Sequence, residues 1–132
     1  MIKGIGHIGI VVRDLEKSLR VASKSLGVPM PPIKEVPDEQ MRFAMIDLEG
    51  IALEFIQDDR KDGDLAAFVR AKGDGIHHFS FLTDNIEQDA QVLKKRGVEF
   101  IYEKPRMGIR GKRFVFTTDD AMGGIPFELS EI

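Results

Sequence analysis

The sequence contains no cysteine and no tryptophan, and it has one tyrosine among its 132 residues. Without cysteine there are no disulfides, thiolate nucleophiles or Cys-based zinc sites, so His, Asp and Glu are the strong metal-ligand candidates. No apolar run reaches the roughly 18–20 residues of a membrane-spanning helix, and the first residues do not resemble a secretory signal. The net charge of −3 offers no basic surface for nucleic acid or for a membrane. We therefore expect a cytoplasmic protein that binds neither.

The first half of the chain predicts a strand, a helix and a hairpin. The run HIGIVV is typical of a buried strand, and Asp14 can cap a helix over residues 15–26 that ends at Gly27. Prolines make residues 29–38 an extended connection, with a further short strand near residues 34–36. The runs MRFAMIDL and IALEFIQ flank Glu49-Gly50, which is the spacing of a tight β-hairpin.

The second half repeats this order after a charged linker. Asp64 can cap a short helix that Gly73 ends. The run GIHHFSFLT then predicts a strand, followed by a helix over about residues 86–96 and three strands, VEFIYE, KRFVFTT and IPFELSE. The glycine-bearing segments RMGIRGK and DDAMGG separate these strands as loops.

An internal repeat is the most informative feature of the sequence. His7 superposes on His78, 71 positions later, and the helix-ending Gly27 superposes on Gly97. The strand IALEFIQ superposes on IPFELSE, which places Glu54 on Glu128. A repeat unit of this size cannot bury a sheet face alone, so the two copies should pack together.

These patterns predict an α+β protein of two tandem βαβββ modules that form a curved mixed sheet around a metal cleft. The first module spans residues 1–57, the linker with its short helix spans 58–74, and the second module spans 75–132. Together they should make one structural domain.

The repeated polar positions predict a metal site. His7, Glu54, His78 and Glu128 supply two imidazoles and two carboxylates, a set that suits a six-coordinate divalent ion with two open positions. Taken singly, a strand histidine is more often a hydrogen-bonded structural residue, and a strand glutamate more often faces solvent. The repeat favours the metal, because burying two carboxylates without a cation is costly. Cobalt, manganese, nickel, magnesium and zinc all suit such ligands.

Other polar segments have simpler interpretations. His77 must point to the opposite strand face from His78, and we interpret it as structural. The loop cations Arg106, Arg110 and Lys112 could bind an anionic substrate group, although a solvated hairpin loop would have the same composition. The acidic run DDRKDGD is better explained as a solvated linker than as a second cation site.

Over nearly its whole length the chain resembles the vicinal oxygen chelate superfamily, whose members are built from paired βαβββ modules. Within it, the similarity is greatest to methylmalonyl-CoA epimerases, on the segments HIGIVVRDLEKS, LAAFVRAKGDGIHHFSFLTDNI, LKKRGV and EKPRMGIRGKRFVFTT followed by GGIPFEL. Carried over position by position, the metal ligands of that family are His7, Glu54, His78 and Glu128, the same four residues that the repeat selects.

The resemblance implies a 1,1-proton transfer at the carbon between a thioester carbonyl and a carboxylate. Glu128 is the proton-transfer candidate on one face. The second base of the family falls at Arg42, with Glu39 and Asp47 nearby but out of register. The first helix also has Val21 and Ala22 where the family commonly has an aromatic pair. The implied partners are an acyl-CoA, whose phosphates Arg106, Arg110 and Lys112 would bind, and a second copy of the chain in a homodimer.

Three other functions fit the same superfamily. A lactoylglutathione lyase has the same ligand set and chain length, but Val11 stands where such lyases usually have arginine, and the LEFIQDD segment lacks their Asn-containing turn. A ring-cleaving dioxygenase usually needs a longer chain. A drug-binding or resistance module would not need the four repeated ligands and often contains more tryptophan and tyrosine.

Overall fold

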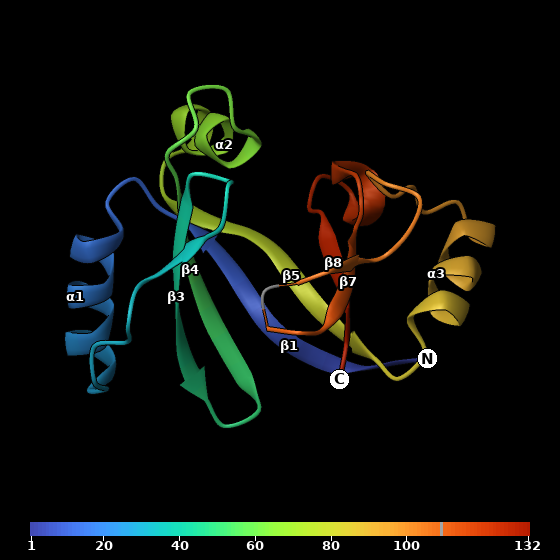
Figure 1. Ribbon diagram of the computed structural model, residues 1–132, viewed down its shortest axis with the longest axis horizontal. Coiled ribbons are helices and arrows are strands. Elements are labelled where there is room, and N and C mark those ends of the chain that lie inside the picture. Colours follow the sequence, from blue (N-terminus) through green and yellow to red (C-terminus); the bar gives the residue numbers. More distant parts are fainter. Residues whose placement is uncertain (109) are drawn as a thin grey trace. The chain divides into compact units, whose positions relative to one another are not determined.

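A computed structural model describes residues 1–108 and 110–132, which form a mixed α+β fold (Figure 1). The strands are β1 (Ile2–Val11), β2 (Lys34–Val36), β3 (Met41–Leu48), β4 (Ile51–Asp58), β5 (Gly75–Thr83), β6 (Arg106–Met107), β7 (Arg113–Phe116) and β8 (Phe127–Glu131). The helices are α1 (Leu15–Leu26), α2 (Asp64–Lys72) and α3 (Ile86–Lys95), with the 3-10 turn η1 at Asp119–Met122. None of the helices in this described part of the chain is long and apolar enough to cross a membrane.

The order of elements confirms the predicted fold class. One module is β1-α1-β2-β3-β4 and the other is β5-α3-β6-β7-β8, with α2 in the segment that joins them. The hydrogen-bonded strand order is β2-β3-β4-β1-β5-β8-β7-β6. The sheet is mixed, because β5 and β8 run parallel whereas β7 is antiparallel to β8. The short strand predicted near residues 34–36 is also confirmed as β2.

The chain folds as two compact units. Unit 1 comprises residues 1–7 and 78–132, and unit 2 comprises residues 8–77. The chain passes from one unit to the other within β1 and again within β5, between the neighbouring residues His77 and His78.

In unit 2, α1 covers one face of the β3–β4 hairpin (Figure 1). Asp14 caps the helix by accepting a hydrogen bond from the Lys17 amide at 3.1 Å, and Gly27 ends it in the left-handed conformation, as predicted. The apolar core of this unit is a cluster of buried residues between the helix and the hairpin. It consists of Val12, Leu15, Leu19, Ala44, Ile46 and Phe55, and Val11 is also fully buried. Alternation along β3 and β4 therefore leaves Phe43, Met45 and Glu54 on the face away from α1.

In unit 1, α3 packs against β8 over a second apolar cluster, which consists of Ile86, Ala90, Val115 and Leu129. Asn85 caps α3 by accepting a hydrogen bond from the Gln88 amide at 3.1 Å. Asn85 thus does for α3 what Asp14 does for α1, as the repeat implies.

The prediction of a strand over residues 98–103 is wrong. Phe100 forms only an isolated bridge with Thr117, flanked by two backbone hydrogen bonds from Ile101 to Phe116 and from Thr118 to Glu99. Phe100 and Tyr102 pack against the α3 cluster instead of continuing a ladder. The paired strand begins later, at β6. The apolar residues of this run therefore reflect core packing and not strand pairing.

The N-terminus of α2 is capped by a residue that the sequence did not suggest. Asp64 is the first helical residue and does not cap α2, while the N-cap Gly63 has no side chain to do so. The carboxylate of Asp58, at the end of β4, accepts a hydrogen bond from the Ala66 amide at 3.2 Å. The same carboxylate forms an ion pair with Arg60. Burial alone would raise the pKa of Asp58, but the bonds from Arg60 and Ala66 outweigh burial and lower it.

Gly63→Ala should destabilise the protein by about 1–3 kcal/mol, because the new Cβ would lie 2.0 Å from Oδ2 of the fully buried Asp58 carboxylate. Gly75→Ala is the matched control, since no atom lies within 4 Å of its Cβ position and its φ is not positive. Urea unfolding measures both variants. Equal stability of the two variants would contradict the cap described here.

Candidate metal centre

Two buried histidines of unit 1 face each other. His7 lies on β1 and is 4% exposed, and His78 lies on β5 and is 3% exposed. Their Nε2 atoms are 3.4 Å apart and their rings meet edge to face. The His78 ring also meets the edge of Phe116 on β7 at 4.9 Å between centroids. The predicted convergence of these two histidines is therefore confirmed within one unit.

A carboxylate completes this group. Glu128 on β8 is half-buried, and its Oε1 lies 3.9 Å from Nε2 of His7. The parallel register of β5 and β8 places Ser80 beside Glu128, and the Ser80 hydroxyl donates a hydrogen bond to the same Oε1 at 2.9 Å. Ser80 is two residues from His78 on the same face of β5. Sequence analysis did not select Ser80, and its spacing from His78 was the one available signal.

The separations of His7 from His78 and from Glu128 are each short enough for two ligands of one divalent ion. Metal–nitrogen and metal–oxygen bonds in proteins are about 2.0–2.2 Å long, so two ligand atoms on one ion lie at most about 4.4 Å apart. The 3.4 Å and 3.9 Å separations in unit 1 lie within that limit. Imidazole and carboxylate ligands suit the first-row divalent metals. The residues therefore fit a bound metal ion, and His7 and His78 have ligand atoms of the right kind.

The protonation state of His7 also suits a metal ligand. Burial, with a smaller contribution from the charge of Arg110, lowers the pKa of His7 from 6.5 to about 4. At neutral pH the imidazole is therefore uncharged, which is the form that binds metals.

Glu54 lies in unit 2, on β4. It is half-buried, its cross-strand partner on β3 is Met45, and its same-face neighbours Ala52 and Ile56 are buried. A carboxylate in an apolar row of this kind needs a charged or polar partner. Its role as a ligand follows from the repeat and belongs to the proposal below.

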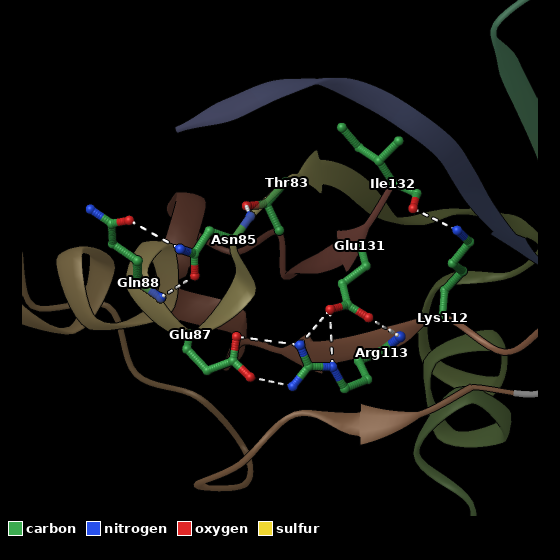
Figure 2. Close-up of polar contacts among 8 residues, drawn as sticks. All are labelled: Thr83, Asn85, Glu87, Gln88, Lys112, Arg113, Glu131 and Ile132. Carbon is green, nitrogen blue, oxygen red and sulfur yellow. Dashed lines mark hydrogen bonds and ion pairs between the residues drawn. The ribbon is translucent and has the colours of Figure 1, made fainter.

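The three predicted substrate-binding cations differ in their surroundings. The guanidinium of Arg106 stacks over the Tyr102 ring at 3.9 Å, and Lys112 donates to the carbonyl of Ile132 at 2.6 Å (Figure 2). Arg110 is exposed, and its charge acts on His7. The loop that carries these residues includes Ile109, which lies outside the described residues. Of the three, Arg110 therefore acts most directly on the metal-binding group.

Arg113, next to this loop, is committed to a different role. Its guanidinium binds Glu131 at 2.5 Å and also binds Glu87 on α3 (Figure 2). These contacts tie β7 to β8 and to the first turn of α3. Arg113 is thus a structural cation.

His77 and Arg42 have partners within unit 2. His77 meets Phe68 of α2 edge-on at 5.0 Å between centroids, which agrees with its structural interpretation. Arg42 lies on the α1 side of β3, where it binds Glu16 at 2.5 Å and Asp59 at 3.4 Å. The position that the resemblance assigned to a second base is therefore occupied by a cation that is ion-paired with two carboxylates.

Comparisons with known proteins agree with this geometry. Residues 6–116 match the model of the glyoxalase/bleomycin resistance protein/dioxygenase superfamily. The chain belongs to this superfamily. The protein YqjC of Bacillus subtilis is 28% identical over 96% of this chain and 91% of its own length. The human mitochondrial methylmalonyl-CoA epimerase is 27% identical over 96% of this chain and 73% of its own length.

A solved structure also places the chain close to an epimerase of this superfamily. It is a variant of Streptomyces coelicolor methylmalonyl-CoA epimerase in complex with 2-nitronate-propionyl-CoA. The TM-score is 0.90 at 26% identity, and the match covers 99% of this chain and 98% of the other. The chain is thus a superfamily member similar to methylmalonyl-CoA epimerases at low identity.

The lowered pKa of His7 predicts a specific pH dependence of stability. A histidine that is harder to protonate in the folded state contributes stability above pH 6.5, and this contribution is lost as the pH falls from 6.5 to about 4. The loss should total about 3 kcal/mol in chelator-treated protein. Urea unfolding of the protein and of His7→Gln between pH 7 and pH 4 measures this loss. The free energy of unfolding of His7→Gln should depend less on pH. Parallel profiles would show that His7 does not titrate in this way.

Proposed function

We propose that this protein is a metal-dependent epimerase of methylmalonyl-CoA or of a similar 2-substituted acyl-CoA. The observation that carries the proposal is the pair of buried histidines of unit 1, whose Nε2 atoms lie 3.4 Å apart, with an oxygen of Glu128 3.9 Å from His7. The similarity to methylmalonyl-CoA epimerases supports this substrate class.

We assign Glu54 as the fourth ligand. The repeat places Glu54 where Glu128 lies in the second module, in the middle of an otherwise apolar strand. Its half-buried position in the apolar row of β4 is consistent with a carboxylate whose charge is balanced by a cation. Two imidazoles and two carboxylates would leave two positions for the oxygens of a bidentate substrate.

Glu128 is the proposed proton-transfer residue. The C–H bond between the two carbonyl groups of the substrate breaks, its proton passes to a Glu128 carboxylate oxygen, and the electron pair moves onto the thioester oxygen. A bound divalent ion would supply Lewis acidity that stabilises this negative charge. The Ser80 hydroxyl holds Oε1 of Glu128 at 2.9 Å and so fixes the orientation of the carboxylate.

Inversion requires that a proton return to the opposite face of the planar enolate. Arg42 does not supply it, because its guanidinium is bound to Glu16 and Asp59 on the α1 side of β3. The same reaction sequence on a hemithioacetal would make the protein a lactoylglutathione lyase-type isomerase. Arg106, Arg110 and Lys112 are the proposed contacts for the anionic groups of the acyl-CoA, and Arg110 is the least committed to partners within the chain.

Deuterium exchange tests the proposed reaction. Metal-loaded protein incubated with methylmalonyl-CoA in heavy water should introduce deuterium at the carbon between the two carbonyls, well above a chelator-treated control. Exchange at the rate of the control, in protein shown to contain metal, would reject this substrate, and a hemithioacetal would then be tested.

Variants separate the metal from the proton transfer. His78→Ala should lose metal, whereas Glu128→Gln should keep partial metal binding and lose exchange by about 100-fold or more. His77→Ala is the matched control, since this neighbouring histidine packs on Phe68 and should leave both properties unchanged. Metal content by plasma mass spectrometry and exchange by NMR measure these effects. Full activity of both site variants would contradict the assignment.

We also propose that the protein is a cytoplasmic homodimer, as small members of the superfamily usually associate. Light scattering coupled to size-exclusion chromatography measures the mass directly. A monomer of 14.8 kDa at micromolar concentration would contradict the dimer.

A further inference from the structure

Unit 2 contains a cavity that the proposed reaction does not use. It has a volume of about 210 Å³ and lies where the ends of β1 and β4 meet α2. Taking about 30 Å³ for each water molecule in the liquid, this space equals that of roughly seven waters. It is lined by Val11, Val12, Arg13, Gln57, Asp58, Asp59, Ala66, Val69 and Arg70.

The apolar part of the lining is well buried. Val11, Val12 and Val69 are at most 7% exposed, and Ala66 on α2 is half-buried. Val11 is the last residue of β1, Val12 directly follows it, and Ala66 and Val69 lie on α2 of the same unit. The cavity therefore offers a fixed apolar wall to a ligand with a short aliphatic body.

The acceptors in the lining already have donors. The Asp58 carboxylate forms an ion pair with Arg60 and accepts a hydrogen bond from the Ala66 amide. Gln57 accepts from the Leu15 amide at 2.8 Å and donates to Asp59 at 2.7 Å. The other oxygen of Asp59 accepts from Arg42. A cationic ligand would have to compete with each of these donors.

The remaining donors belong to two arginines. Arg13 binds Asp74 through its Nε at 3.3 Å, and within residues 1–108 and 110–132 its two Nη groups have no hydrogen-bond partner. Arg70 donates from Nη1 to the Lys61 carbonyl at 3.4 Å and has no ion pair in the same part of the chain. Guanidinium groups bind carboxylates and phosphates through paired hydrogen bonds.

We propose that this cavity is a second ligand site, which binds a small organic oxyanion with a short aliphatic body between Arg13 and Arg70. The guanidinium groups hold the carboxylate or phosphate group, and the valines and Ala66 contact the aliphatic part. None of the lining residues is a proposed metal ligand or proton-transfer residue, so the proposed site can be tested separately from the epimerase reaction.

Pentanoate is the probe, and its binding is followed by NMR of isotope-labelled full-length protein. The titration is repeated with added zinc, so that binding of pentanoate at the metal ligands is distinguished from binding in the cavity. The methyl resonances of Val11, Val12 and Val69 should shift and saturate at millimolar pentanoate. Arg70→Gln should weaken binding by about tenfold or more, since it removes charge-assisted hydrogen bonds. Arg20→Gln is the matched control, because Arg20 is exposed on α1 and outside the cavity.

A second variant keeps both arginines and reduces the volume of the cavity. Ala66→Leu retains the backbone amide that Asp58 accepts from, fills the cavity with a larger side chain, and should also abolish saturable binding. Three results would overturn the proposal. Pentanoate affinity could fall equally in Arg70→Gln and Arg20→Gln, or uncharged pentanol could bind as tightly as pentanoate. The third is that inorganic phosphate binds as tightly as pentanoate. The last would indicate an adventitious ion only.

Discussion

The close approach of two buried imidazoles is the constraint on which the site depends. Nε2 of His7 and Nε2 of His78 are 3.4 Å apart in an interior where neither ring is more than 4% exposed. Two protonated imidazoles at this distance would repel each other strongly in a medium that screens charge poorly. Burial, with a smaller contribution from the charge of Arg110, already lowers the pKa of His7, so its imidazole is uncharged at neutral pH. The same constraint favours a bound cation, which replaces the missing protons as the positive charge of the site.

The strand pairing of unit 1 explains how this group is held. The parallel register of β5 and β8 sets Ser80 beside Glu128, and alternation along β5 puts His78 on the same face as Ser80. Rigid strands thus supply the histidine, the carboxylate and the hydroxyl that orients it. Ion pairs of Arg113 with Glu87 and Glu131 hold β7, β8 and α3 together in the same unit (Figure 2).

Much of the fold could be predicted because its signals are local. The cap Asp14 and the stop at Gly27 act within a few residues, and the structure confirms both. The pairing of His7 with His78 was predictable because the sequence repeats. The cap of α2 by Asp58 was not, since that carboxylate comes from the preceding strand. The role of Arg42 was missed for a similar reason: its partners Glu16 and Asp59 belong to other elements.

We propose that His7 and His78 bind one ion through their Nε2 atoms. The direct measurement is a zinc titration followed by the ring ¹⁵N resonances of the three histidines. We expect the Nε2 signals of His7 and His78 to shift together and to saturate at one equivalent, while those of His77 stay unchanged. A shift of only one of the two histidines, or an equal response of His77, would show that His7 and His78 do not share an ion.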